Sequence, residues 1–380
     1  MRDASYPTIV VAGGGSAGHV SPMLATAKAL VKRYPEARVL ALGTKDGLEA
    51  DLVPAAGFEL LTIDKVPFPR RPGLAALRFP FAFAKQIATV RSLLRNHRVN
   101  AIAGFGGYVC PPAYIAGALA RIPIALHEAN KHPGLANLLG ARVAKVVASA
   151  FDPVSGGRSL PGAVRVGMPM RETIAHLDRA ARREDAQRSF GLDPSLPTLL
   201  VTGGSLGAVA LNETLVAALP ELEQLGVQVL HVTGRGKRVE ASGAHYHQVE
   251  YVQAMEDAYA AADFAVTRSG AGTVCELAAV GLPALFIPLP IGNGEQALNG
   301  ADVVAAGGAR MIPDAELTVA GLVTTVRECL LQPDVNSEMS ASARHFGVTD
   351  AAERLADMIA AQIPPRESKT AKDRSRKGHQ

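Results

Sequence analysis

Residues 8–20 read TIVVAGGGSAGHV, an apolar β-branched run that stops at three glycines and continues as a helix-like stretch. Residues 198–207 read TLLVTGGSLG and repeat the same order of strand, glycine turn and helix. A second pair of segments, FGGYVCPPAYIAGALARIP at 105–123 and RSGAGTVCELAAVGLP at 268–283, also matches between the two halves. Two copies of one pattern predict an α/β chain of two doubly wound, Rossmann-like domains, with ligands beyond the carboxyl ends of their strands.

Short apolar runs alternate with Ala- and Leu-rich stretches along the whole chain, as expected for parallel sheets covered by helices on both faces. Strands are predicted at 8–12, 38–42, 100–103, 123–126, 198–202, 227–231, 263–267 and 283–287, and helices at 19–32, 206–219 and 272–280. A boundary near residues 165–168 divides the chain into domains 1–167 and 168–345. Residues 364–380 are polar and charged, and a disordered basic tail is expected there.

Composition and charge narrow the class of protein. The chain of 380 residues is 48% hydrophobic, and its three cysteines show no metal-binding or disulfide spacing. No targeting segment and no run of 18 apolar residues is visible. Residues 1–165 carry 20 basic and 9 acidic side chains, whereas residues 166–365 carry 13 and 24. A basic first half suits an anionic membrane surface or nucleic acid, and the absence of Trp and of stacking motifs disfavours nucleic acid.

The first glycine loop, residues 13–18, formally fits the dinucleotide pattern G-x-G-x-x-G. That pattern also needs an acid at the end of the second strand, and Asp46 lies beyond the turn, which disfavours NAD. The loop still favours phosphate, because helix N-termini expose N–H groups. His19 follows directly and is a candidate general base, although a capping or packing histidine is the alternative.

Three segments of the second half carry further candidates. Ser205 lies in the second glycine loop and can contact a diphosphate. Glu276 falls about one turn into a predicted helix, where it can accept hydrogen bonds from ribose hydroxyls. Gln296 and its polar neighbours suit sugar hydroxyls. The alternative for Ser205 is a tight turn without a ligand, for Glu276 an acid that complements the helix dipole, and for Gln296 a solvated loop. No Asp-x-Asp motif or metal-spaced cluster appears, so neither a bound metal nor a cofactor is predicted.

Residues 65–85 read KVPFPRRPGLAALRFPFAFAK and mix apolar and basic side chains without any acid. This mixture is typical of an interfacial membrane anchor, and a buried helix next to a basic loop is the alternative. The candidate membrane residues are Phe68, Arg70, Arg71, Leu77, Arg78, Phe79, Phe81, Phe83 and Lys85.

Seven segments, in order, resemble the MurG family over roughly residues 7–362: GGGSAGHVSP, GFGGYV, HEANKHPGLAN, VGMPMR, TGGSLGA, RSGAGTVCELAAVGLPALFIPLP and GNGEQALN. The last segment resembles the actinobacterial branch. The resemblance implies a GT-B glycosyltransferase fold with a helix at about 346–363 that packs back on the first domain. It also implies transfer of GlcNAc from UDP-GlcNAc, with inversion, to the muramyl 4-hydroxyl of lipid I, which forms lipid II in peptidoglycan synthesis.

The resemblance also implies roles for individual residues and partners. His19 would be the catalytic base. The donor would contact Ser16, Ala17, Gly18, Asn130, Arg171, Ser205, Val252, Ala271, Gly272, Thr273, Glu276 and Gln296. The acceptor would contact Gly15, Gly18, Gly106, Gly107 and Tyr108. The partners would be UDP-GlcNAc, lipid I, the anionic inner leaflet at the cytoplasmic face of the cell membrane, and other cell-wall or division proteins, without nucleic acid.

Several positions depart from the family pattern. Ser16 and Ala17 replace Thr-Gly, Met168 replaces an Asn or Val, and Gly272 replaces a Leu or Met. Leu206 replaces a Gln near the diphosphate, and Glu295 replaces the first of two Gln beside the sugar.

Three other functions stay open. The alternatives are a related GT-B enzyme with another acceptor or a UDP-GlcNAc 2-epimerase, a membrane-bound scaffold that senses UDP-sugar, and an NAD oxidoreductase. An epimerase needs no membrane segment, and a scaffold needs no His19.

Overall fold

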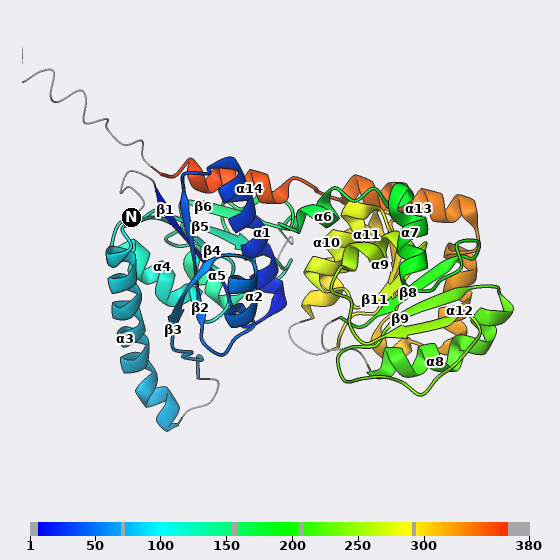
Figure 1. Ribbon diagram of the computed structural model, residues 1–380. Helices are drawn as coiled ribbons and strands as arrows, with labels where there is room; N and C mark the ends of the chain where they lie inside the picture. Colours follow the sequence, from blue (N-terminus) through cyan, green and yellow to red (C-terminus); the bar gives the residue numbers. More distant parts are fainter. Residues whose placement is uncertain (1–6, 70–72, 154–157, 205–208, 291–293, 364–380) are drawn as a thin grey trace, which may run out of the picture.

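The computed structural model describes residues 7–69, 73–153, 158–204, 209–290 and 294–363. These residues form two lobes, each built around one sheet (Figure 1). The first sheet has the strand order β3-β2-β1-β4-β5-β6-β7 and the second β10-β9-β8-β11-β12-β13. All pairings in both sheets are parallel. The predicted α/β class, with two Rossmann-like domains in the GT-B manner, is confirmed.

The first lobe holds the elements that precede residues 166–171, which form the linker to the second lobe. Its strands are β1 (Thr8–Ala12), β2 (Arg38–Thr44), β3 (Glu59–Ile63), β4 (Val99–Gly104), β5 (Ile124–Glu128), β6 (Val146–Ser149) and β7 (Val164–Arg165). Its helices are α1 (Ala17–Arg33), α2 (Glu49–Ala55), α3 (Leu74–Asn96), α4 (Cys110–Leu119) and α5 (Leu135–Gly140).

The second lobe follows the same plan of alternating strands and helices. Its strands are β8 (Thr198–Thr202), β9 (Gln228–Val232), β10 (Tyr246–Val249), β11 (Phe264–Thr267), β12 (Ala284–Phe286) and β13 (Ala309–Met311). The helices after the linker are α6 (Glu172–Ala175), α7 (Arg179–Ser189), α8 (Val209–Gln224), α9 (Met255–Ala261), α10 (Ala271–Val280), α11 (Glu295–Ala305), the 3₁₀ turn η1 (Asp314–Glu316), α12 (Val319–Cys329), α13 (Pro333–Phe346) and α14 (Ala351–Ala360).

The glycine-terminated strand β1 is buried at every position. Ile9 and Val11 pack with α1 and α14, whereas Val10 and Ala12 pack with α3 and α4. Successive strand residues point to opposite faces, so a strand covered on both faces must be apolar throughout. This burial fixes β1 in the middle of its sheet and places residues 13–18 at its carboxyl end.

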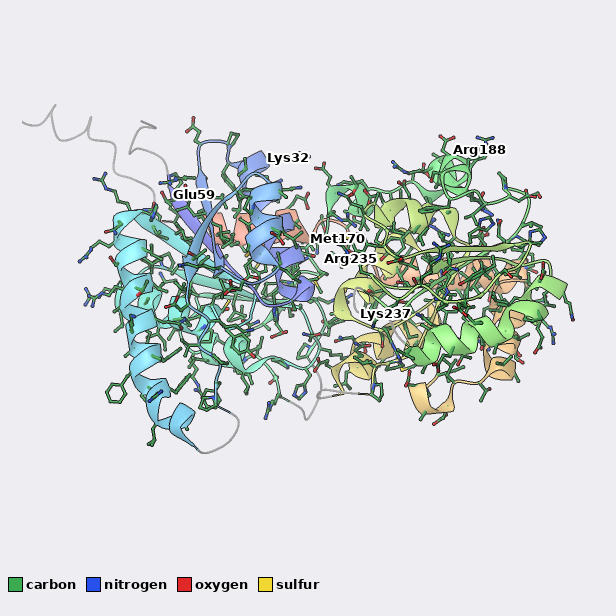
Figure 2. The ribbon with its side chains drawn as sticks, turned by 60° about the horizontal axis from the view of Figure 1, so that its bottom comes forward. Lys32, Glu59, Met170, Arg188, Arg235 and Lys237 are labelled. Carbon is green, nitrogen blue, oxygen red and sulfur yellow. The ribbon has the colours of Figure 1, made fainter. Side chains whose placement is uncertain are left out.

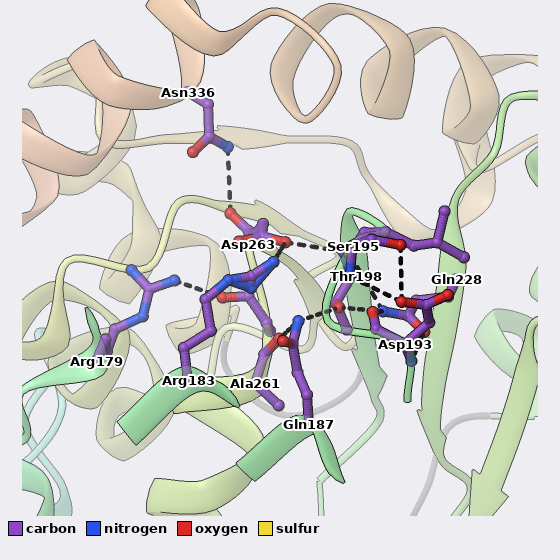
Figure 3. Close-up of polar contacts among 12 residues, drawn as sticks. Arg179, Arg183, Gln187, Asp193, Ser195, Thr198, Gln228, Ala261, Asp263 and Asn336 are labelled. Atoms are coloured by element: carbon purple, nitrogen blue, oxygen red, sulfur yellow. Dashed lines mark hydrogen bonds and ion pairs between the residues drawn. The ribbon is translucent and has the colours of Figure 1, made fainter. Parts of the chain in front are cut away.

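The amino ends of β8 and β11 are held by a partly buried polar network (Figure 3). One carboxylate oxygen of Asp263 accepts hydrogen bonds from the Thr198 backbone N–H, at 2.9 Å, and from Arg183, at 2.8 Å. Gln187 donates to the Thr198 hydroxyl at 3.0 Å. Burial raises the pKa of Asp263, and its hydrogen bond from Thr198 opposes the shift. The network lies at the strand ends opposite the predicted ligand edge, so its role is to hold the sheet.

The chain crosses between the lobes twice. Met170, in the first crossing, lies between the two lobes (Figure 2). The second crossing ends in α14, which lies beside α1 (Figure 1). Leu355 and Ile359 of α14 are buried in the core of the first domain, because one stripe of this helix is apolar. Arg33 of α1 also donates two hydrogen bonds to Asp357, at 2.6 and 2.7 Å.

Candidate active site

His19 lies in the first turn of α1, just past the first glycine loop. Its Nδ1 is 3.1 Å from the Gly14 carbonyl oxygen and 3.1 Å from the Ser16 hydroxyl. A carbonyl oxygen only accepts hydrogen bonds, so this contact assigns the proton of a neutral imidazole to Nδ1. Nε2 then carries the lone pair that a general base needs.

The loop after β4 packs directly on this histidine. A Cβ at Gly106, where φ is +102°, would lie 2.8 Å from His19 Nε2. A Cβ at Gly107, where φ is +86°, would lie 2.3 Å from the Gly14 carbonyl oxygen. Only glycine fits at these two positions, which brings the two glycine loops of the first domain together around His19. Of the predicted acceptor residues, Gly15 lies on the first loop, Gly18 lies in the first turn of α1 that follows it, and Gly106, Gly107 and Tyr108 lie on the other loop.

A buried carboxylate under the glycine loop was not predicted from the sequence. Glu49, at the start of α2, is fully buried. One oxygen accepts hydrogen bonds from the Thr44 backbone N–H and hydroxyl, at 2.9 and 2.7 Å. The other accepts from the Gly15 backbone N–H at 3.1 Å. A Cβ at Gly14 would lie 2.5 Å from a Glu49 oxygen. Glu49 therefore shapes the loop from below and occupies one of its N–H groups.

The hydrogen bonds of Glu49 also set its charge. Burial alone would raise the pKa of this carboxyl. The Thr44 hydroxyl and the backbone N–H groups of Glu49, Thr44 and Gly15 outweigh burial and lower the pKa below its ordinary value. Glu49 follows β2, where a dinucleotide-binding acid would be sought, but it faces the loop backbone. No local motif of the sequence marks Glu49 as a contact of this loop, because Gly15 lies 34 residues before it in the chain.

The carboxyl end of β5 presents two neighbouring residues with different tasks. His127 is buried, and its Nε2 is 2.8 Å from the Gly167 carbonyl oxygen in the linker. Burial lowers the pKa of His127 to about 4, so it is neutral. Glu128 accepts hydrogen bonds from the backbone N–H groups of Asn130, at 2.9 Å, and Gly134, at 3.0 Å. Glu128 thus folds the loop that carries Asn130, a predicted donor-binding residue.

The nucleotide candidates gather on the second domain. Glu276, in α10, accepts a 2.8 Å hydrogen bond from Tyr259. Burial raises the pKa of Glu276, while the Tyr259 hydrogen bond and the charge of Arg171 oppose the shift. Arg171 lies 3.5 Å from Glu256 and donates to the Gln253 carbonyl oxygen at 3.1 Å. Val252 is buried next to Gln253.

The remaining donor candidates lie at two helix starts. Ala271, Gly272 and Thr273 form the first turn of α10. A Cβ at Gly270 or at Gly272 would meet no atom within 4 Å, so there is open space at this turn. Gln296 lies in the first turn of α11 and accepts a 3.0 Å hydrogen bond from the Leu289 backbone N–H. Ser16, Ala17 and Gly18 begin α1, and Ser205 lies outside the described residues.

Residues 74–85 of the candidate membrane segment form the first half of α3, which lies at the outer edge of the first lobe (Figure 1). Phe68, Leu77 and Phe81 are 67%, 71% and 80% exposed. Phe79 and Phe83 are half-buried and stack with ring centroids 5.3 Å apart. Arg78 and Lys85 are exposed, and Arg70 and Arg71 lie outside the described residues. Such an exposed apolar row does not fit the alternative of an ordinary buried helix.

Within the described residues, no helix combines the length and the apolar composition that crossing a membrane requires. In the same part of the chain, no group of three or more His, Cys, Asp or Glu side chains is arranged to hold a metal ion.

Comparison with known proteins agrees with this geometry. Residues 9–149 match the glycosyltransferase family 28 N-terminal domain, and residues 198–355 match the glycosyltransferase family 28 C-terminal domain. The UDP-N-acetylglucosamine--N-acetylmuramyl-(pentapeptide) pyrophosphoryl-undecaprenol N-acetylglucosamine transferase of Paenarthrobacter aurescens is 49% identical over 94% of this chain and 97% of its own length.

Solved structures give the same picture. MurG of Acinetobacter baumannii superposes with a TM-score of 0.73 at 29% identity, over 93% of this chain and 99% of that one. The UDP-GlcNAc 2-epimerase of Neisseria meningitidis shares the fold at only 12% identity, with a TM-score of 0.67 over 93% and 100% of the two chains. The two matching family domains and the near-complete match at 49% identity lead to one conclusion: this chain belongs to the MurG family of glycosyltransferase family 28.

Proposed function

We propose that this chain transfers GlcNAc from UDP-GlcNAc to undecaprenyl-pyrophosphoryl-MurNAc-pentapeptide, lipid I, and so forms lipid II. The observation that carries the proposal is the setting of His19. Its Nδ1 contacts the Gly14 carbonyl, and its Nε2 lies against Gly106, where the two glycine loops of the first domain meet. A general base fixed in one tautomer can deprotonate a hydroxyl group, and the two glycine loops beside it can bind a phosphate group. This combination suits an acceptor that carries both a hydroxyl and a diphosphate.

The reaction is a single displacement with inversion. The muramyl 4-hydroxyl oxygen attacks the anomeric carbon, and its proton passes to His19 Nε2. The bond from the anomeric carbon to the diphosphate oxygen breaks, and UDP leaves with the electron pair. The transition state is oxocarbenium-like, as in glycoside chemistry. Because negative charge develops on the departing diphosphate, cationic and N–H groups near it accelerate the step.

The second domain supplies those groups. Arg171 and the first turn of α10, Ala271 to Thr273, contact the nucleotide diphosphate together with Ser205. Glu276 binds the ribose, and Val252 contacts the uracil through its main chain. Asn130 and Gln296 hold the sugar from opposite domains. The open space at Gly270 and Gly272 supports this placement, because no side chain competes with a ligand there.

The acceptor diphosphate binds at the first glycine loop and the loop after β4. Since the Gly15 N–H is committed to Glu49, the N–H groups of Ser16, Ala17 and Gly18 at the start of α1 remain as anion donors. Gly106, Gly107 and Tyr108 complete this subsite.

The lipid acceptor requires the enzyme to work at a membrane surface. The exposed Phe68, Leu77 and Phe81, with Arg78 and Lys85 beside them, insert at the anionic inner leaflet of the cytoplasmic membrane. The protein is thus peripheral, at the cytoplasmic face, where other cell-wall or division proteins are its neighbours.

The test is a radiolabelled transfer assay. Purified protein is incubated with UDP-GlcNAc labelled in the sugar and a short-chain lipid I analogue, and organic-extractable label is counted. Label in the lipid product, absent when the analogue is omitted, supports the proposal. Label that stays aqueous, with UDP-ManNAc formed from the donor, overturns the proposal in favour of the epimerase reaction.

A further inference from the structure

A loop of the first domain is bonded to a helix of the second. The backbone N–H of Lys131 donates to Asn299 Oδ1 at 2.9 Å. Asn299 Nδ2 donates to Asn130 Oδ1 at 3.2 Å. The ammonium of Lys131 also forms an ion pair with Asp302. All three contacts join the loop after β5 to α11, so they tie the two domains together.

These contacts are shielded from water. Asn299 is fully buried, and the side chains of Lys131 and Asp302 are only 11% and 33% exposed. An ion pair with this little exposure is screened by salt much less than a surface pair. The chain offers a matched comparison, because Lys32 of α1 and Glu172 of α6 also join the two domains, at 2.5 Å, but are 66% and 60% exposed. Lys32 is labelled in Figure 2.

The tied elements both carry predicted sugar contacts. The loop is held in shape by Glu128, which accepts from the Asn130 and Gly134 N–H groups. On α11, Gln296 precedes Asn299 by three residues, so both lie near one face of the helix. The bond to Asn299 uses the carbonyl oxygen of Asn130 and leaves its amide N–H groups for a ligand hydroxyl. The separation of Asn130 and Gln296 therefore depends on this junction.

We propose that Lys131 and Asp302 are positioning residues: their ion pair, with the Asn130–Asn299 hydrogen bond, clamps the loop after β5 onto α11 and sets the cleft width across the donor sugar. The effect of this clamp on sugar transfer rests on the proposed function. Its effect on the distance between the domains does not depend on any substrate.

The experiment compares Lys131→Met, Asp302→Asn and the charge swap Lys131→Asp with Asp302→Lys, using Lys32→Met as the control. Each full-length protein is measured by small-angle X-ray scattering without ligand, by calorimetric titration with UDP, and by transfer kinetics. Both single variants should show a larger radius of gyration than wild type. Their kcat/KM for UDP-GlcNAc should fall about tenfold. The affinity for UDP should stay within about twofold, because its proposed contacts lie on the second domain.

The swap should recover most of the lost kcat/KM, and Lys32→Met should match wild type in all three measurements. An unchanged radius of gyration in both single variants contradicts the clamp. So does an equal loss in Lys32→Met, or a loss of UDP affinity as large as the loss of transfer, since that pattern indicates general damage. A wild-type protein that transfers no GlcNAc overturns the proposed function alone, and the ligand-free scattering still decides whether the clamp exists.

Discussion

Replacing Glu49 with Gln tests whether a buried carboxylate builds the glycine loop. In the wild type, one Glu49 oxygen faces the Thr44 N–H and hydroxyl, and the other faces the Gly15 N–H. A Gln amide has only one oxygen. In either orientation its NH₂ group therefore faces a backbone N–H, and one buried donor loses its partner.

The magnitude follows from these contacts. Hydrogen bonds to a buried charge contribute about 1.5–3 kcal/mol, and an unsatisfied buried N–H costs about 1–3 kcal/mol. Relief by movement is limited, because the Gly14 and Gly47 positions already lie against the carboxylate. We expect the free energy of unfolding to fall by about 3 kcal/mol. For a domain of this size, that lowers Tm by roughly 6–12 °C. Transfer should also weaken, because Gly14 holds His19.

Calorimetry at several pH values checks both the size and the sign. The pKa of Glu49 in the folded protein lies below its ordinary value of 4.5. Its stabilisation is therefore fully present above pH 4.5 and is lost as the pH falls through the folded pKa. The Tm difference between wild type and Glu49→Gln should be constant near neutral pH and shrink below pH 4.5.

The control is Glu59→Gln, since Glu59 forms an exposed ion pair with Arg38 and such pairs contribute about 1 kcal/mol or less. A Tm of Glu49→Gln within the error of that of Glu59→Gln, or a Tm difference that grows on acidification, would contradict this role of the Glu49 carboxylate.

Two further predictions follow from the donor site and the membrane segment. Glu276→Gln should raise the Kd for UDP-GlcNAc about tenfold, because a neutral amide accepts weaker hydrogen bonds than a carboxylate. Calorimetric titration measures this Kd, and an unchanged value would show that Glu276 does not bind the nucleotide. Changing Phe68, Leu77 and Phe81 together to Ser should weaken binding to anionic liposomes at least tenfold in a sedimentation assay, since these side chains are mostly exposed and their transfer into lipid is favourable. The Tm and the transfer to a water-compatible acceptor analogue should stay near wild type. Undiminished liposome binding would show that these side chains do not anchor the protein to the membrane.

The strands show how far the sequence carries the fold. All eight predicted strands are present, with ends that differ by up to two residues. Among the described residues, the five strands that were not predicted are β3, β7, β10 and β13, which are the edges of the two sheets, and the four-residue β6. Edge strands are only partly buried, so their sequences lack the continuous apolar run that marks a central strand. The pattern therefore identifies the middle of each sheet and loses its margins.

The site shows a similar division. Glycine loops and residues at strand ends can be identified from the sequence, because consecutive residues determine the turn. The roles of Glu49 and of the Lys131–Asp302 pair cannot be identified in this way. The first acts on a loop 34 residues away and the second joins positions 171 residues apart. Their roles depend on tertiary approach, which no short motif encodes.

The roles of individual residues stay predictions, and His19 is the one on which the mechanism depends. The most direct measurement is transfer by His19→Ala, with UDP affinity determined on the same preparation. General-base loss typically slows a reaction 10²–10⁴-fold, so turnover should fall at least 100-fold while UDP affinity is unchanged. Turnover near wild type would contradict the role of His19 as the general base.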